Sequence, residues 1–243
     1  MPRDRNVRRA IALQNDPALP PTLELRTNLC EIIRPDSKMK ERLERHLPPL
    51  PTCNGTNCAV RTFFQKAAEE GIPVELDVGC GYGRFSRAHA LANPRIRLLG
   101  IEQDDARVAR SDVLARKSGI ANLAYLIGEA RYALEYCIPE NSISAIFILF
   151  PDPWPKDRHA RNRIFRKPVV DLLFRLLIPG GFLHAATDNE PYFRQMQSVM
   201  ADDLRFQSVP AYRRSEDEQT DFEQKFLSQG KFVHAASWQK QTS

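Results

Sequence analysis

Long apolar runs are missing from this sequence of 243 residues. The longest one extends only from Ala145 to Phe150, far short of the roughly 20 residues that a membrane-spanning helix needs. The basic N-terminal residues also lack the apolar stretch of a secretory signal. We therefore expect a cytoplasmic protein with no membrane partner.

Cysteine is also scarce, with five residues scattered along the chain. Cys53 and Cys58 lie close together, but no second Cys or His pair at zinc-binding spacing accompanies them. His159, His184 and His234 show no metal-like grouping either. We expect reduced thiols, no disulfide framework and no metal site.

Neither polar nor apolar residues dominate, since 42% of residues are hydrophobic and 27% are charged. These values exclude a wholly disordered or fibrous chain, and the length suits one large domain, alone or with an appendage. Residues 1–51 are rich in Arg and Pro and end in a Pro-rich run that cannot continue a helix. We expect a basic N-terminal extension over residues 1–51 and the main domain over residues 52–243.

From about residue 58, short apolar strands alternate with helical stretches. The expected strands are 74–78, 96–101, 123–127, 143–150 and 182–186, and the expected helices are 84–92, 104–118, 129–137, 164–177 and 189–203. This alternation predicts an α/β fold of the Rossmann-like type with a mostly parallel sheet. Pro179-Gly180-Gly181 is expected to end a helix and turn the chain into a strand. Segments 205–212 and 231–238 are expected to add antiparallel C-terminal edge strands.

A glycine-rich turn follows the first strand, where Asp77 leads into Gly79, Gly81 and Gly83. Glycines at alternate positions let the backbone turn tightly and approach a ligand closely. A dinucleotide fingerprint would need glycine where Arg84 stands, so a nicotinamide oxidoreductase is a distant alternative. The spacing fits better the turn that faces the amino-acid part of S-adenosylmethionine. We expect Asp77, Gly79 and Gly81 to contribute to that cofactor site.

Two acidic residues end the next two strands. Glu102 stands where a carboxylate can accept hydrogen bonds from both hydroxyls of a ribose. Glu129 can accept from an adenine amino group, or it can serve as a helix N-terminal acid that complements the helix dipole. The glycine turn and Glu102 together favour a cofactor site over a solvated surface.

The most specific sequence motif of the chain follows the fourth expected strand. Three prolines within residues 151–155 stiffen a loop that carries Asp152 and Trp154 at the expected ligand crevice. The segment 151–167 has a net charge of +4, against +5 for the whole chain, from six basic and two acidic residues: Lys156, Arg158, Arg161, Arg163, Arg166, Lys167, Asp152 and Asp157. A fixed acid, an aromatic face and cations suggest a base recognised by its edge and phosphates held by Lys and Arg. A proline-rich turn with a solvated basic helix is the alternative.

Four motifs, which follow one another along the chain, carry a resemblance to a known protein family. They are Gly100-Ile101-Glu102, the segment from Phe150 to His159, Ala186-Thr187-Asp188-Asn189-Glu190, and Thr220-Asp221-Phe222-Glu223. Over about residues 74–238 the sequence resembles the bacterial tRNA (guanine-N7-)-methyltransferase family. The resemblance implies the class I S-adenosylmethionine-dependent methyltransferase fold and methyl transfer from S-adenosyl-L-methionine to a guanine N7 in tRNA, position 46 of the variable loop in the family.

Site residues follow from the same resemblance. It implies cofactor contacts from Gly79, Glu102, Glu129 and Asp152, and substrate contacts from Lys156, Asp188, Thr220 and Glu223. Trp154 and Arg158 join the substrate set from the character of their segment, and Asp152 is the catalytic candidate. The family often has Glu at the position of Asp77 and Asp at that of Glu129, and commonly has basic residues at the positions of Asp157 and Asn162.

Some of these residues also have structural alternatives. Thr220 and Glu223 form a capping-box pattern that can simply start a helix, and Asp188 can cap the helix 189–203. Two other functions stay open at this point. One is a methyltransferase that acts on another RNA, a protein or a small molecule, and the other is a non-catalytic RNA-binding protein. A monomer and a homodimer are equally compatible with the sequence.

Overall fold

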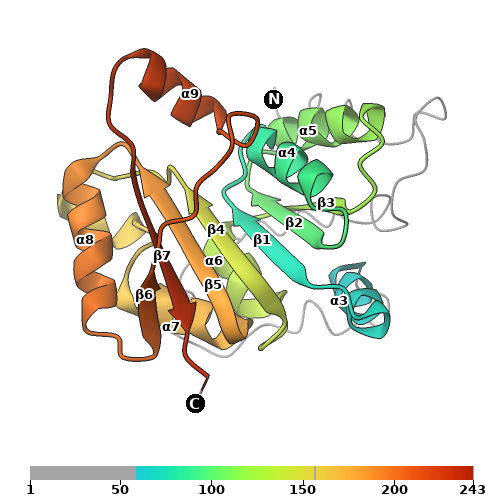
Figure 1. Ribbon diagram of the computed structural model, residues 1–243, viewed down its shortest axis with the longest axis horizontal. Helices are drawn as coiled ribbons and strands as arrows, with labels where there is room; N and C mark the ends of the chain where they lie inside the picture. Colours follow the sequence, from blue (N-terminus) through green and yellow to red (C-terminus); the bar gives the residue numbers. More distant parts are fainter. Residues whose placement is uncertain (1–58, 156, 243) are drawn as a thin grey trace.

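The computed structural model describes residues 59–155 and 157–242. Within these residues one seven-stranded sheet has the order β3-β2-β1-β4-β5-β7-β6 (Figure 1). Strands β1 to β5 pair in parallel, and β7 is antiparallel to β5 and to β6. The strands are β1 (Val74–Val78), β2 (Arg97–Glu102), β3 (Leu123–Ile127), β4 (Ile143–Leu149), β5 (Leu177–Thr187), β6 (Phe206–Val209) and β7 (His234–Lys240).

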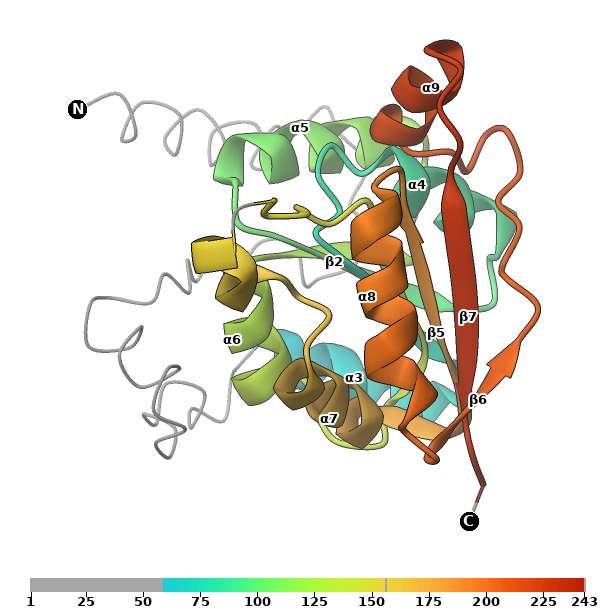
Figure 2. The same ribbon diagram turned by 90° about the vertical axis from the view of Figure 1, so that its left-hand side faces the viewer.

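Helices cover both faces of this sheet. They are α3 (Ala59–Glu70), α4 (Arg84–Ala92), α5 (Asp105–Lys117), α6 (Ala130–Tyr136), α7 (Lys167–Leu176), α8 (Glu190–Ala201) and α9 (Asp221–Ser228), with a short 3₁₀ helix η2 (Asp157–Asn162). Helices α3, α6, α7 and α8 share one hydrophobic core, and α4 and α5 pack on the opposite face (Figures 1 and 2). No helix of the described ranges combines the length and the apolar character needed to cross a bilayer.

The central strand β4 shows why the sheet is covered on both sides. Ile146 and Ile148 belong to the core beneath α6 and α7, whereas Phe147 and Leu149 belong to the core on the other face. All four side chains are buried. The doubly apolar run that sequence analysis assigned to a central parallel strand is thus confirmed, because both faces of the strand need apolar side chains.

Pro179-Gly180-Gly181 does not separate a helix from a strand as expected. Helix α7 ends at Leu176, and β5 begins at once and includes the three residues. The pairing with β4 shifts between the Ile143 and Ala145 positions, so the tripeptide lies in a bulge. A Cβ at Gly181 would stand 2.9 Å from the Ile178 carbonyl oxygen and 3.1 Å from that of Ile143, so the surrounding backbone approaches too closely for a side chain.

The antiparallel C-terminal strands are confirmed, with β7 inserted between β5 and the edge strand β6. Lys240 fixes the end of β7: it is buried, and its Nζ donates to the carbonyl oxygens of Phe174 and Leu177 at 2.9 and 2.6 Å. Helix α9 lies in the connection between β6 and β7, above the carboxyl end of the sheet (Figure 1).

Several expectations fall on residues that the structure does not describe. The basic N-terminal extension over residues 1–51 lies outside the described residues, as do Cys53 and Cys58. Of the cysteines that the structure describes, Cys80 is a free thiol. The division of the chain at residue 51 therefore stays a prediction.

Candidate active site

The strand order reverses between β1 and β4, whose neighbours lie on opposite sides. In open α/β sheets, ligands bind at the carboxyl ends of the strands beside such a reversal. The carboxyl ends of β1 to β5 and the loops that leave them carry every described cofactor and substrate candidate of the sequence analysis except Thr220 and Glu223. Those two lie at the start of α9, above the same edge (Figure 1).

The turn after β1 needs glycine for two different reasons. Gly79 and Gly81 have φ of 79° and 56°, and a Cβ at either position would meet no atom of the described residues within 4 Å. Their backbone therefore lies bare beside open space, which suits a closely approaching ligand. Gly83 has φ of 63° and no room at all, since a Cβ would stand 2.0 Å from Ser111 Oγ.

Asp77 lies beneath this turn rather than in open space. Its side chain is buried and accepts a hydrogen bond from Ser86 Oγ in α4. Burial raises the pKa of Asp77 to about 7, and the Ser86 hydrogen bond and the His89 charge only partly offset this effect. The carboxyl group thus joins β1 to the first turn of α4.

Asp77→Asn is expected to stabilise the protein at pH 8. A raised folded pKa means that the folded state binds the proton more tightly, so stability is lost as pH rises from about 4 to about 7. Removing the charge should recover up to about 4 kcal/mol above pH 7 and less as pH falls. Urea unfolding at pH 5 and pH 8 measures this difference.

Asp112→Asn provides the matched control. Asp112 is as buried as Asp77, at 3% exposure, but it forms an ion pair with Arg116 at 3.0 Å. Its neutralisation should lower stability at both pH values. A loss of stability for Asp77→Asn at pH 8 would show that the Asp77 carboxylate is stabilised by contacts that outweigh its burial.

Glu102 is buried at the end of β2 and holds two backbone amides. Its Oε2 accepts from Gly81 N and its Oε1 from Asp104 N, both at 3.0 Å. Arg107 Nη1 lies 3.9 Å from Oε2. An ionised carboxylate has about four acceptor sites, so two hydroxyl donors can still be accommodated. Glu102 therefore orders the glycine turn and retains capacity for a ribose.

Glu129 shows the alternative role that sequence analysis left open. It is the N-cap of α6, where its Oε2 accepts from Tyr132 N at 2.9 Å, and Arg131 Nε lies 3.2 Å from its Oε1. The side chain remains 26% exposed. The capping function is thus observed, and contact with an adenine stays a prediction.

The loop after β4 is held in an unusual backbone conformation. Phe150 and Trp154 have φ of 53° and 41°, which is rare for residues with a side chain. Each such residue costs on the order of 1–3 kcal/mol and persists only where its surroundings enforce it. Between them Asp152 is exposed, and no partner of its carboxylate occurs among the described residues.

Arg163 helps to hold the loop after β4 in this backbone conformation. Its Nε donates to Pro153 O at 2.8 Å and its Nη2 to Trp154 O at 3.0 Å. Its Nη1 donates to Gln195 Oε1 in α8, and the guanidinium lies over the Tyr192 ring. The sequence suggests Arg163 as one of the phosphate-binding cations, which stays a prediction, but in the described structure its donors are directed at the loop and at α8.

Two other cations of this segment, Arg158 and Arg161, remain available, whereas Lys167 Nζ lies 2.8 Å from Asp203 Oδ2. Arg158 and Arg161 are exposed in η2, and neither forms an ion pair within the described part of the chain. Lys156, a predicted substrate contact, lies outside the described residues. Trp154 is half-buried, with its ring edge-on to His159 at 5.7 Å between centroids.

The distal candidates gather around α9. Thr220 caps this helix by accepting from Glu223 N at 3.0 Å, as the capping-box alternative predicts. Glu223 is buried in a two-point ion pair with Arg214, at 2.6 and 2.7 Å. Asp188 lies 3.1 Å from Lys231 Nζ. Asp188 is not a cap, because Asn189 caps α8 by accepting from Tyr192 N.

Sequence reasoning missed the residues that position these groups. Arg214, Lys231 and Arg163 look like ordinary surface cations in the sequence, and only the fold brings them to their partners. A motif-level signal exists for Arg163 alone, since it lies in the basic run behind the proline-rich loop.

Comparison with known proteins places the chain among methyltransferases. A family profile described as "Putative methyltransferase" matches residues 72–236. The tRNA (guanine-N(7)-)-methyltransferase of Sodalis glossinidius is 37% identical over 60% of this chain and 60% of that protein. The enzyme of the same name from Halorhodospira halophila is 35% identical over 71% of this chain and 75% of that protein. The chain spans about three fifths of the length of the Sodalis relative.

Solved structures agree in fold. The 16S rRNA methyltransferase KamB superposes with a TM-score of 0.56 at 17% identity, over 74% of this chain and 93% of that one. A variant of the 16S rRNA (adenine(1408)-N(1))-methyltransferase from Catenulisporales acidiphilia gives 0.54 at 18% identity, over 77% and 93%. The fold is thus that of class I S-adenosylmethionine-dependent methyltransferases, as predicted.

Proposed function

We propose that this chain, which belongs to the family of the tRNA (guanine-N(7)-)-methyltransferases, transfers a methyl group from S-adenosyl-L-methionine to the N7 atom of a guanine in tRNA. The observation that carries the proposal is the meeting of the bare glycine turn, Glu102 and Asp152 at one edge of the sheet, on neighbouring strands.

The residues at this edge fit S-adenosylmethionine. The open space beside Gly79 and Gly81 can receive the amino-acid part against the backbone. Glu102 has acceptor sites left for both ribose hydroxyls, and the exposed part of Glu129 can accept from the adenine amino group. When bound, the cofactor supplies a methyl group made electrophilic by the sulfonium charge.

Guanine N7 carries an unprotonated lone pair, so no residue has to remove a proton to create the nucleophile. What the chain must supply is in-line placement of the base, an effect that can be worth about 7–11 kcal/mol at best. Asp152 is suited to this because its loop is stiff and its carboxylate is exposed. It can accept from the guanine N1 and N2 hydrogens and stabilise the positive charge that the purine gains.

The tRNA backbone would be held by cations and by α9. Arg158 and Arg161 are exposed beside the proline-rich loop and can neutralise phosphates. Trp154 offers a half-buried aromatic face for a base. Asp188, Thr220 and Glu223 would contact the substrate from the other side of the crevice, with Lys156 completing the set.

A single assay tests the proposed function. The protein is incubated with labelled S-adenosylmethionine and either unmodified bulk tRNA or 16S rRNA, and the methylated nucleoside is identified after digestion. We expect 7-methylguanosine from tRNA only. A product other than 7-methylguanosine, or label confined to rRNA, would contradict the proposal. Cofactor binding without any transfer would favour the non-catalytic RNA-binding alternative.

Glu102→Ala is expected to weaken S-adenosylmethionine binding by about 1.5–3 kcal/mol, because a carboxylate that accepts two hydroxyls is removed. Calorimetric titration measures the affinity. Asp104→Ala is the matched control: it removes the N-cap of α5 in the same loop, which lowers stability by about 1 kcal/mol without removing a ribose acceptor. Equal affinities for the two variants would exclude Glu102 from the site.

A further inference from the structure

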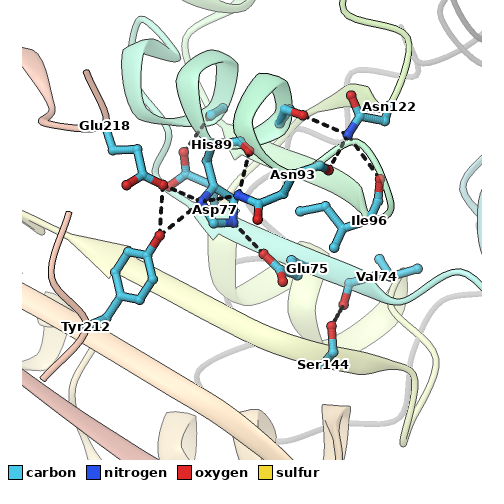
Figure 3. A network of polar contacts seen from close by, with 12 residues as sticks. Val74, Glu75, Asp77, His89, Asn93, Ile96, Asn122, Ser144, Tyr212 and Glu218 are labelled. Atoms are coloured by element: carbon cyan, nitrogen blue, oxygen red, sulfur yellow. Dashed lines mark hydrogen bonds and ion pairs between the residues drawn. The ribbon is translucent and has the colours of Figure 1, made fainter. Parts of the chain in front are cut away.

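His89 occupies a buried position between two carboxylates that lie far apart in the sequence. It belongs to α4, its Nε2 lies 2.7 Å from Glu75 Oε2 in β1, and its Nδ1 lies 2.8 Å from Glu218 Oε1 (Figure 3). Its ring stacks on Phe85 at 5.0 Å between centroids. Burial alone would lower the pKa of His89, but the hydrogen bonds and charges of the two glutamates together raise it above its usual value. The charged ring can therefore donate to both carboxylates.

Glu218 extends this contact into the segment that precedes α9. It is buried, and its Oε1 also accepts from the Tyr212 hydroxyl at 2.8 Å (Figure 3). Its other oxygen accepts from Ser215 N at 2.9 Å and from Ser215 Oγ at 3.1 Å. The Glu218 carboxylate thus forms hydrogen bonds within the turn from Tyr212 to Glu218 and also connects this turn to α4.

A second contact from α4 reaches the same segment. Arg84 Nε donates to the Gln219 carbonyl oxygen at 3.0 Å. The next residue, Thr220, caps α9. Gly83 of the glycine turn is the N-cap residue of α4. One rigid helix therefore touches the candidate cofactor turn at its start and the α9 segment along its length.

The contacts on the far side of α9 are weaker. Lys231 pairs with Asp188 while remaining 48% exposed, and Phe226 meets Phe150 at 5.8 Å between ring centroids. The segment 212–231 also contains the buried Arg214–Glu223 pair, but both of its partners belong to the segment itself. Glu218 is different, because its carboxylate joins the segment to His89 of α4 through a buried contact. Exposed ion pairs contribute little to the stability of the fold. A buried charge network fixes the geometry of its members, because leaving any one of them unpaired costs folding free energy.

We propose that His89 is a positioning residue. Together with Glu75, Tyr212 and Glu218 it forms a buried polar cluster, called the latch below, that holds α9 over the active site. The latch thereby supports tRNA recognition rather than cofactor binding. The role in tRNA recognition rests on the proposed function. The charged or titratable groups that face His89 from other elements are Glu75 and Asp77 on β1, His184 on β5, and Tyr212 and Glu218 before α9.

The test compares Glu218→Gln with Glu216→Gln. Glu216 lies on the same turn and is exposed, so its substitution removes the same charge without touching the latch. For Glu218→Gln we expect amide hydrogen exchange over residues 212–231 to accelerate at least tenfold and KM for tRNA to rise about tenfold. The S-adenosylmethionine Kd should stay within twofold of the wild-type value. Glu216→Gln should match the wild type in all three measurements.

Three results would overturn the latch. They are wild-type exchange in Glu218→Gln, faster exchange with an unchanged KM for tRNA, and an equal loss of cofactor and tRNA binding together with faster exchange throughout the chain. Tyr212→Phe removes only the hydroxyl donor and gives a milder change in the same direction if Glu218→Gln does not fold. Hydrogen exchange needs no activity, so it decides whether the latch exists even if the wild type methylates no tRNA.

Discussion

Asp152→Asn is expected to slow single-turnover methylation of tRNA by roughly a hundred- to a thousandfold while leaving the melting temperature unchanged. Asparagine keeps the shape of the side chain, but it has no negative charge and turns an amide donor towards the donors of guanine. The carboxylate is exposed and has no partner among the described residues, so its loss removes no hydrogen bond of the described fold.

Asp152→Glu separates charge from placement. It keeps the charge and moves it by one methylene, so we expect a rate between those of the wild type and the asparagine variant. Thermal melts beside the rate measurements detect any loss of fold. Normal turnover of Asp152→Asn would mean that the chemistry is organised elsewhere, with Asp188 and Glu223 as the next candidates. A lower melting temperature at a normal rate would make Asp152 a loop-holding residue.

Arg163→Lys is expected to reduce turnover by about a hundredfold without changing the salt dependence of tRNA binding. Lysine carries a single point charge and cannot donate to Pro153 O and Trp154 O at once as the guanidinium does. The strained loop should then relax, and a misplacement of about 1 Å is enough for such a loss. Single-turnover rates and tRNA affinities at several salt concentrations measure the two effects separately.

Arg161→Ala and Arg158→Ala are the contrasting variants, because both side chains are exposed. Each should flatten the slope of log affinity against log salt by about 0.7–0.9 for every phosphate that the arginine neutralises in the wild type, with little change in the rate at saturation. If Arg163→Lys changes the slope as these variants do, its guanidinium binds phosphate in the complex. If Arg158→Ala and Arg161→Ala keep the wild-type slope, the cationic run is only a solvated surface.

The sequence predicted the parallel part of the fold closely, because the information is local. Strand β4 needs apolar residues on both faces, and the glycines after β1 occur where the backbone adopts positive φ. Helix caps were also visible, since Thr220 lies three residues before Glu223. Such patterns depend on neighbours in the chain and can be recognised without a structure.

The contacts that hold the site together could not be predicted in the same way. His89 and Glu218 meet across 129 positions of sequence, and neither belongs to a motif. Arg163 is a cation in a basic segment, so the sequence alone suggests that it binds phosphate. Only the positions of the Pro153 and Trp154 carbonyl groups reveal another role. Asp188 and Lys231 meet only because β5 and the α9 segment converge at one end of the sheet.

Insertion of β7 between β5 and β6 has a consequence for biosynthesis. The ribosome releases β5, at Leu177–Thr187, well before it produces His234–Lys240, so a nascent chain exposes the backbone edge of β5 until β7 emerges. An unpaired edge strand readily accepts a strand from another chain. Non-local pairing of this kind is also slow to form. We therefore expect this protein to aggregate most readily on crowded polysomes and in concentrated refolding mixtures. Dilution should raise the refolding yield.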